Sequence, residues 1–117
     1  MPSHGISIHV VDTTRSRAAV GMKVEVFSLG SQRTLIASGV VGPRGIVEEP
    51  RLAARRDPGC YEVVFHVADY FRSTGVILPV RPFLDVVPYQ FGIADAERHY
   101  HLPFKTTPWG FSCFLGA

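Results

Sequence analysis

Apolar and polar side chains alternate along most of the chain, and this alternation predicts short β-strands. In the segment 5–12, Ile6, Ile8 and Val10 face one side while the positions between them face the other, which is the pattern of a half-buried strand. Strand-like stretches occur at residues 5–12, 22–29, 34–41, 46–47, 61–67, 83–93, 98–105 and 108–115. These eight short strands and their spacing predict an all-β fold, a two-layered sandwich.

One short helix is predicted over residues 67–74, VADYFRST, because Gly75 follows it as a C-terminal breaker. Residues 12–17 are predicted to form a loop, and residues 42–45, GPRG, a turn. The length of 117 residues and the lack of repeats or long linkers predict one domain spanning residues 1–117. The 11 Gly and 9 Pro residues therefore separate strands of this domain and do not mark disorder.

The composition is rich in apolar residues and poor in charge. Hydrophobic residues make up 46% of the chain, enough to fill a core, while charged residues make up 19%, below the usual quarter. This balance predicts apolar surface that is either exposed or buried against another copy of the chain. The net charge of +2 is scattered along the sequence, so no nucleic-acid partner is expected. No signal peptide or membrane-spanning stretch is recognised, which predicts a cytoplasmic protein with no membrane partner.

The two cysteines, Cys60 and Cys113, show neither metal-type spacing nor a disulfide framework, and reduced thiols are predicted. Cys113 is interpreted as a buried structural thiol, with a role as nucleophile as the alternative. His66 lies in an apolar stretch and is predicted to be packed or hydrogen-bonded at the edge of the core.

A pair of histidines near the C-terminus is a stronger candidate for chemistry. In the sequence HYHLP the period of two places His99 and His101 on one face of a strand. Two imidazoles about 7 Å apart can share a substrate or a metal ion. Zinc would need further ligands, and His9, on the polar face of the first strand, is the one obvious third. No metal and no cofactor are therefore predicted.

Several motifs together resemble the transthyretin-like 5-hydroxyisourate hydrolases. They are ISIHVVD at 6–12, YEVVF at 61–65 with DYF at 69–71, HYHLP at 99–103 and PWGFS at 108–112. The resemblance covers essentially the whole chain. It implies a transthyretin-like eight-stranded β-sandwich with one short helix, assembled as a homotetramer with active sites at a dimer interface. It also implies a small-molecule cyclic substrate, because the family opens the ring of 5-hydroxyisourate.

The resemblance extends to particular residues. In that family, ring opening is associated with a His in the first strand, an Arg after a turn, a His of the H-Y-H motif and a C-terminal Y-R-G-S. His9 matches the first histidine and His101, the second His of the motif, matches the other. A neutral imidazole can take a proton from water as it attacks a ring carbonyl, and a second can return one to the leaving nitrogen. His9 and His101 are therefore predicted to be catalytic.

The sequence also departs from the family pattern at two places. Where the family has D-G-R, anchoring on Ile46 puts Gly45 at the arginine position, so Arg44 can serve only if the turn is remodelled. The terminal Phe114-Leu115-Gly116-Ala117 replaces Y-R-G-S, and only the glycine is kept. The residues predicted to contact substrate are Arg44, His99, Ser112, Cys113, Phe114 and Leu115.

These departures predict a site that is more apolar and less cationic than the family's. The leading hypothesis is a diverged 5-hydroxyisourate-hydrolase homologue, repurposed for a less polar cyclic substrate, as in a biosynthetic pathway. One alternative is a functional 5-hydroxyisourate hydrolase of urate degradation, in purine metabolism. The other is a non-catalytic carrier of hydrophobic ligands, which Phe114 and Leu115 would suit. Retention of both His9 and His101 favours an enzyme.

Overall fold

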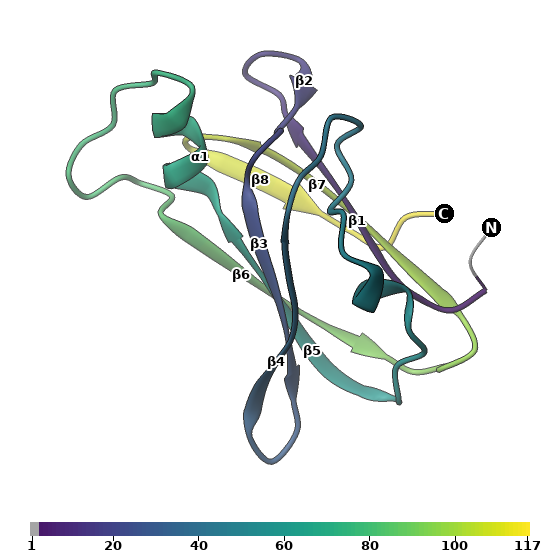
Figure 1. The fold of residues 1–117 in the computed structure, drawn as a ribbon. Coiled ribbons are helices and arrows are strands. Elements are labelled where there is room, and N and C mark those ends of the chain that lie inside the picture. Colours follow the sequence, from purple (N-terminus) through teal and green to yellow (C-terminus); the bar gives the residue numbers. More distant parts are fainter. Residues whose placement is uncertain (1–2) are drawn as a thin grey trace.

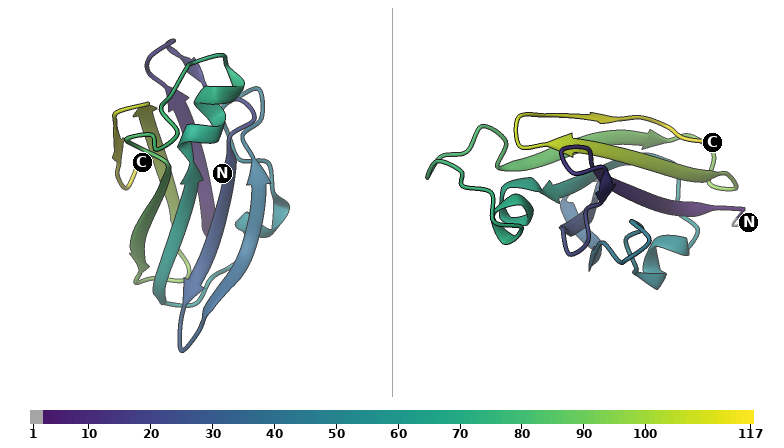
Figure 2. Two further views of the ribbon diagram at one scale, coloured as in Figure 1. Left: turned by 90° about the vertical axis from the view of Figure 1, so that its left-hand side faces the viewer. Right: turned by 90° about the horizontal axis from the view of Figure 1, so that it is seen from above.

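Two four-stranded sheets pack face to face in the computed structural model, which describes residues 3–117 (Figure 1; Figure 2). One sheet has the strand order β2-β1-β7-β8 and the other has the order β4-β3-β5-β6. The strands are β1 (Gly5–Asp12), β2 (Arg17–Ala18), β3 (Lys23–Leu29), β4 (Arg33–Val40), β5 (Gly59–His66), β6 (Val86–Ile93), β7 (His99–Thr107) and β8 (Gly110–Cys113). The predicted transthyretin-like β-sandwich is confirmed.

The pairing of β1 with β7 is parallel and brings together strands from the two ends of the sequence. Their register runs from Gly5 opposite His99 to Asp12 opposite Thr106. Strand β8 forms an antiparallel hairpin with β7, and all pairings of the second sheet are also antiparallel. The first sheet therefore holds both histidine-bearing strands side by side at its centre.

One predicted strand is wrong, and a short strand was missed. Residues 46 and 47 make only isolated bridges, Ile46 with His9 and Val47 with Val41, so they form no strand of their own. Instead, residues 17 and 18, the first of them assigned to a loop, pair with the end of β1. Two residues are too few to show alternation, which explains why the sequence pattern did not reveal β2.

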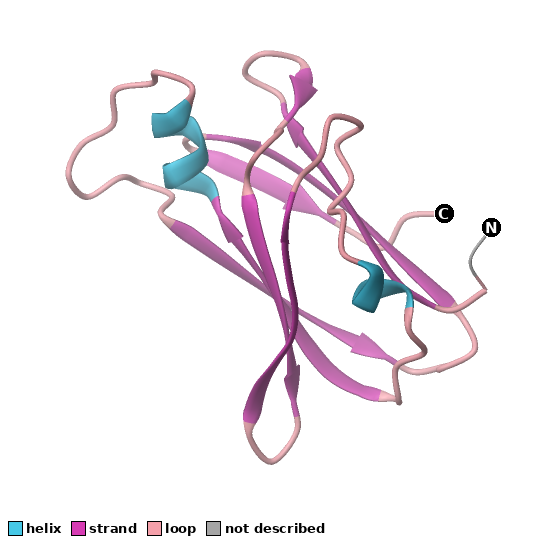
Figure 3. Ribbon diagram, viewed as in Figure 1, coloured by secondary structure: helices cyan, strands magenta, loops and turns pink. Residues whose placement is uncertain are grey.

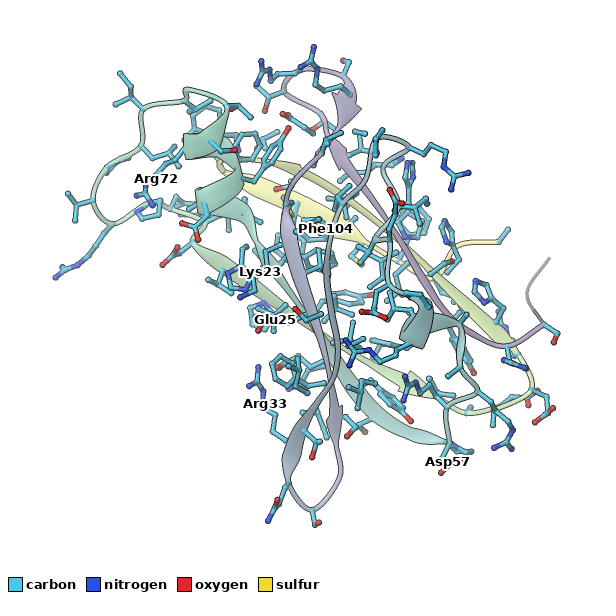
Figure 4. The ribbon with its side chains drawn as sticks, in the orientation of Figure 1. Lys23, Glu25, Arg33, Asp57, Arg72 and Phe104 are labelled. Carbon is cyan, nitrogen blue, oxygen red and sulfur yellow. The ribbon has the colours of Figure 1, made fainter. Side chains whose placement is uncertain are left out.

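The inward positions of β1 and β7 form the centre of the core, as their alternation predicted. Ile6, Ile8 and Val10 are buried on β1, and Leu102 is buried on β7. Phe104, labelled in Figure 4, stacks on Phe65 of the opposite sheet with ring centroids 3.7 Å apart. Burying each such side chain stabilises the fold by about 1.5–3 kcal/mol. This burial holds the two sheets together and fixes which face of β1 and β7 points outward.

The predicted helix is confirmed as α1 (Val67–Ser73), shown in cyan in Figure 3 together with the short 3-10 helix η1 (Pro50–Ala53). Helix α1 is followed by Gly75 at φ +94°. The hydroxyl of Tyr70 donates to the buried Asp12 carboxylate at 2.9 Å, which ties α1 to the end of β1. Burial, and then the Asp12 contact, raise the pKa of Tyr70 to about 12.

The helices found within residues 3–117 are too short or too polar to cross a membrane. Cys60 and Cys113 are free thiols, as predicted.

Candidate functional site

Alternate side chains of β1 and β7 bring the predicted histidines together on the outward face of the first sheet. Ser7 and His9 come from β1, and His99 and His101 come from β7; all four are half-buried. The register pairs Ser7 with His101, so His9 lies two residues beyond the partner of His101 on β1. The spacing between strands and the rise along them put the Cα atoms of His9 and His101 roughly 8 Å apart. Two imidazoles at this separation can reach opposite sides of one small ring.

Ser7 links the two histidines of β7. Its Oγ lies 2.6 Å from His101 Nδ1 and 2.8 Å from His99 Nε2. The second ring nitrogen of His99, Nδ1, lies 2.9 Å from the carbonyl oxygen of His4. Four groups thus form one hydrogen-bonded chain that ends at His101. Ser7 was not among the predicted site residues, although its place two residues before His9 on the same polar face was a signal for it.

The turn after β4 lies against His9. Gly45 has φ +82°, and its carbonyl oxygen accepts a hydrogen bond of 2.8 Å from the amide of Val10. A Cβ on Gly45 would come within 2.7 Å of His9 Nε2 and 2.8 Å of His9 Cδ2. A glycine therefore allows the backbone to approach the imidazole more closely than any side chain would permit. Arg44 precedes it as an exposed residue of the turn.

The C-terminal tail covers His101 from the other side. The amide of Gly116 donates to the His101 carbonyl oxygen at 2.7 Å, continuing the register of β7 with β8. A Cβ on Gly116 would lie 2.8 Å from His101 Cδ2 and 3.0 Å from a ring carbon of Pro103. The one residue that the tail shares with the family motif thus has a steric reason to be glycine.

The tail residues before Gly116 are apolar and exposed. Phe114 and Leu115 keep 46% and 47% of their surface accessible, so this end of the site offers apolar area and no side-chain hydrogen-bond donor of its own. Lys105 lies near the tail, with its Nζ 5.8 Å from the centroid of the Phe114 ring.

The surroundings of His101 favour its neutral form. Burial lowers the pKa of His101, and positive charge on His9 or on His99 would lower it further. A neutral imidazole has one nitrogen with a free lone pair, which is the state that a general base requires.

The remaining predicted substrate contacts are not gathered at the histidines. Ser112 is exposed and, with Lys105 and Thr107, lines a shallow groove of about 350 Å³ at the turn between β7 and β8. Cys113 stands opposite Phe104 in the ladder, so it shares the core-facing side of the sheet. Burial raises the pKa of the Cys113 thiol to about 11, which suits a structural residue better than a reactive one.

The other histidine considered in the sequence, His66, belongs to the second sheet. Its Nε2 lies 2.7 Å from a carboxylate oxygen of Glu25, which Figure 4 labels, so it is hydrogen-bonded as predicted. Across residues 3–117, no three His, Cys, Asp or Glu side chains are grouped so that they could hold a metal ion. The arrangement offers the acid/base chemistry of its imidazoles.

Comparison with known proteins gives consistent matches over nearly the whole chain. Residues 6–116 match the HIUase/Transthyretin family. "5-hydroxyisourate hydrolase 2" of Rhizobium meliloti is 44% identical over 114 residues, covering 96% of this chain and 95% of that protein. A 5-hydroxyisourate hydrolase of Deinococcus radiodurans is 37% identical over 115 residues, covering 97% and 96% of the two chains.

Two solved structures share the fold. A structure of (S)-allantoin synthase superposes with a TM-score of 0.88 at 32% identity; the match covers 97% of this chain and 43% of that one, so this chain spans less than half of its length. The 5-hydroxyisourate hydrolase of Klebsiella pneumoniae superposes with a TM-score of 0.81 over 97% of this chain and 99% of that one. At 24% identity the second likeness concerns the fold alone.

Proposed function

Because the chain belongs to the HIUase/Transthyretin family, we propose that it is an enzyme that uses His9 and His101 for acid/base chemistry on a small cyclic substrate. The observation that carries this proposal is the placement of both imidazoles on one outward face, with His101 held by Ser7. A carrier needs no such pair. The family's two histidine positions are kept here even though its other polar groups are not.

The proposed reaction is hydrolysis of a cyclic amide. Neutral His101 takes a proton from water while the water oxygen bonds to a ring carbonyl carbon. The carbon–nitrogen bond of the ring then breaks, and His9, in its protonated form, gives a proton to the leaving nitrogen. General acid/base steps of this kind contribute about 10²- to 10⁴-fold to a rate. The lowered pKa of His101 is the reason to assign it the role of base.

We propose that the substrate is less polar than 5-hydroxyisourate. The support is the predicted loss of donors around the histidines: anchoring on Ile46 puts Gly45 at the position of the family's arginine, and by the resemblance Phe114 and Leu115 stand in place of a tyrosine and an arginine. A site that lacks partners for a substrate's polar groups leaves those groups desolvated and unpaired, which costs about 1–3 kcal/mol for each one. An apolar substituent facing Phe114 would instead gain from burial.

A homotetramer with the site at a dimer interface fits this proposal. The histidine-bearing sheet carries the exposed Trp109 at the turn of its β7–β8 hairpin as well as the apolar tail. Packing against a second copy would remove this apolar surface from water and narrow the open site. The test is the oligomeric state in solution, measured by light scattering: a tetramer is expected, and a monomer would refute the assembly. The cytoplasmic location and the single domain over residues 1–117 stay predictions.

The experiment compares ring opening of freshly generated 5-hydroxyisourate with that of alkyl- and aryl-substituted cyclic amides, using wild type and the variants His9→Asn and His101→Asn. We expect a less polar ring to be opened with the higher kcat/KM, and each variant to lower it about 100-fold or more while remaining folded by circular dichroism. If no ring is opened, or if both variants retain full activity, the proposed chemistry is refuted.

Hydrolysis of 5-hydroxyisourate itself is the second candidate, favoured by relatives of that name at 44% and 37% identity. In the same assay it would appear as rapid decay of 5-hydroxyisourate with little turnover of apolar rings. A carrier would bind apolar ligands, turn none over and tolerate both histidine substitutions.

A further inference from the structure

Each hydrogen bond in the chain from the His4 carbonyl to His101 has a definite donor and acceptor. The bond between His99 and the His4 carbonyl sets this order. His99 Nδ1 lies 2.9 Å from the carbonyl oxygen of His4. A carbonyl oxygen can only accept a hydrogen bond, so Nδ1 of His99 must carry the hydrogen. In a neutral imidazole the other nitrogen, Nε2, is then an acceptor.

The direction passes through Ser7. Its Oγ lies 2.8 Å from His99 Nε2, so the serine hydroxyl donates its single hydrogen to that nitrogen. The contact of 2.6 Å between the same Oγ and His101 Nδ1 must then be one in which the serine accepts. The hydrogen of that bond belongs to His101, so Nδ1 of His101 is protonated.

We infer that Ser7 and His99 are positioning residues that hold neutral His101 in the tautomer with hydrogen on Nδ1, leaving the lone pair on Nε2 for the substrate site. An imidazole without such partners populates both tautomers, and only one of them presents a base at Nε2. Gly116 allows the tail to lie against Cδ2, the ring atom next to Nε2, and the hydrogen bond to Ser7 fixes the other edge of the ring. The catalytic use of this tautomer rests on the proposed acid/base role of His101. The tautomer itself follows from the hydrogen bonds alone.

The direction holds while His99 is neutral. If His99 carried a second hydrogen, both of its ring nitrogens would donate. Ser7 would then accept from His99 Nε2 and would donate its own hydrogen bond to His101 Nδ1. The titratable side chains around the hydrogen-bonded chain are His4, His9, His99 and His101. A test well above the usual histidine pKa, at about pH 8, keeps the chain in a single direction.

The first experiment determines the tautomer of His101 by NMR in the absence of substrate. Imidazole nitrogens that carry hydrogen and those that do not have well-separated nitrogen-15 chemical shifts, and His101→Gln assigns the signals of His101 by their loss. In wild type we expect His101 with a protonated Nδ1 and an unprotonated Nε2. Ser7→Ala should shift the signals toward a mixture of tautomers, and Ser7→Thr, which keeps the hydroxyl, should restore them. Ser31→Ala, at an exposed serine between β3 and β4 of the other sheet, should leave these signals unchanged.

The second experiment measures how the tautomer affects kcat and KM for whichever ring the enzyme opens. Ser7→Ala should lower kcat about tenfold with little change in KM, because substrate contacts remain while the base is wrongly presented in part of the molecules. His99→Gln, whose amide oxygen can accept from Ser7, should keep the activity, and His99→Phe, which cannot accept, should lose it as Ser7→Ala does.

The outcomes separate this inference from the proposed function. A wild-type His101 with hydrogen on Nε2, or a Ser7→Ala variant with unchanged tautomer and kcat, would overturn the inference even if the enzyme is active. The expected tautomer in a protein that opens no ring would refute the proposed function and leave the inference in place.

Discussion

Gly45→Ala tests how closely the turn after β4 approaches His9. The substitution adds one methyl group at a residue with φ +82°, a conformation that L-residues with a side chain adopt at a cost. The added Cβ would lie 2.7 Å from His9 Nε2, well inside the ordinary contact distance. The imidazole, the turn or both must therefore move by several tenths of an ångström.

Two contributions make up the expected loss of stability. The left-handed backbone costs about 1–2 kcal/mol for a residue with a Cβ. Forcing an extra carbon into a filled space costs about 1–3 kcal/mol more, so the free energy of unfolding should fall by about 2–5 kcal/mol. The unfolding entropy of a chain of 117 residues is about 0.25 kcal/mol/K, so each kcal/mol lowers Tm by about 4 °C.

Gly75→Ala is the matched control. Gly75 has φ +94°, and no atom lies within 4 Å of the position its Cβ would take. It should therefore show the backbone contribution alone, a decrease in Tm of about 4–8 °C, against about 8–20 °C for Gly45→Ala. Thermal unfolding followed by circular dichroism measures both variants, and turnover measured below Tm should fall only for Gly45→Ala, since only that variant displaces His9.

Equal losses of stability in the two variants, with activity retained in both, would refute the reasoning. That result would mean that the turn does not lie against the imidazole. It would also remove the steric explanation for glycine at position 45.

Three further predictions concern polar side chains that are buried or half-buried. Tyr70→Phe leaves Oδ2 of the buried Asp12 carboxylate without its donor, while Oδ1 keeps the amide of Arg15, and should lower the free energy of unfolding by about 1.5–3 kcal/mol, measured by urea denaturation; a loss below about 0.5 kcal/mol would contradict it. With its pKa raised to about 11, the Cys113 thiol should be alkylated far more slowly than exposed Cys60 at pH 8, and faster as the pH rises, which mass spectrometry can follow; equal rates would contradict it. Because its pKa is lowered by folding, His101 binds a proton more readily in the unfolded chain, so stability should decrease as the pH falls below about 6.5, and His101→Asn should flatten that decrease; an unchanged profile would contradict it.

Much of the fold follows from local patterns in the sequence. The alternation around Ile6, Ile8 and Val10 predicted both a strand and the side of it that is buried. The breaker Gly75 at the end of VADYFRST predicted the helix that became α1. Local patterns succeed here because side chains alternate between the two faces of any strand, whatever its partners are.

The candidate site was predictable only in part. The same alternation placed His9 outward on β1, and His99 and His101 outward on β7, and the family resemblance singled out His9 and His101. Ser7 shares the polar face of His9, but its role could not be predicted locally because it depends on His101, 94 residues away in the chain. Cys113 was counted among the substrate contacts, yet the ladder puts it opposite Phe104 on the core side.

The sequence by itself determined which segments form strands and which histidines stand on polar faces, because both depend on neighbours in the chain. Only the tertiary structure decided that β1 lies parallel to β7 with Ser7 opposite His101, and that glycines at 45 and 116 let backbone close over the two imidazoles. Register and close approach are settled by packing summed over the whole sandwich. A shift of one residue in either strand would turn its histidines into the core, and the strand pattern alone does not choose the partner.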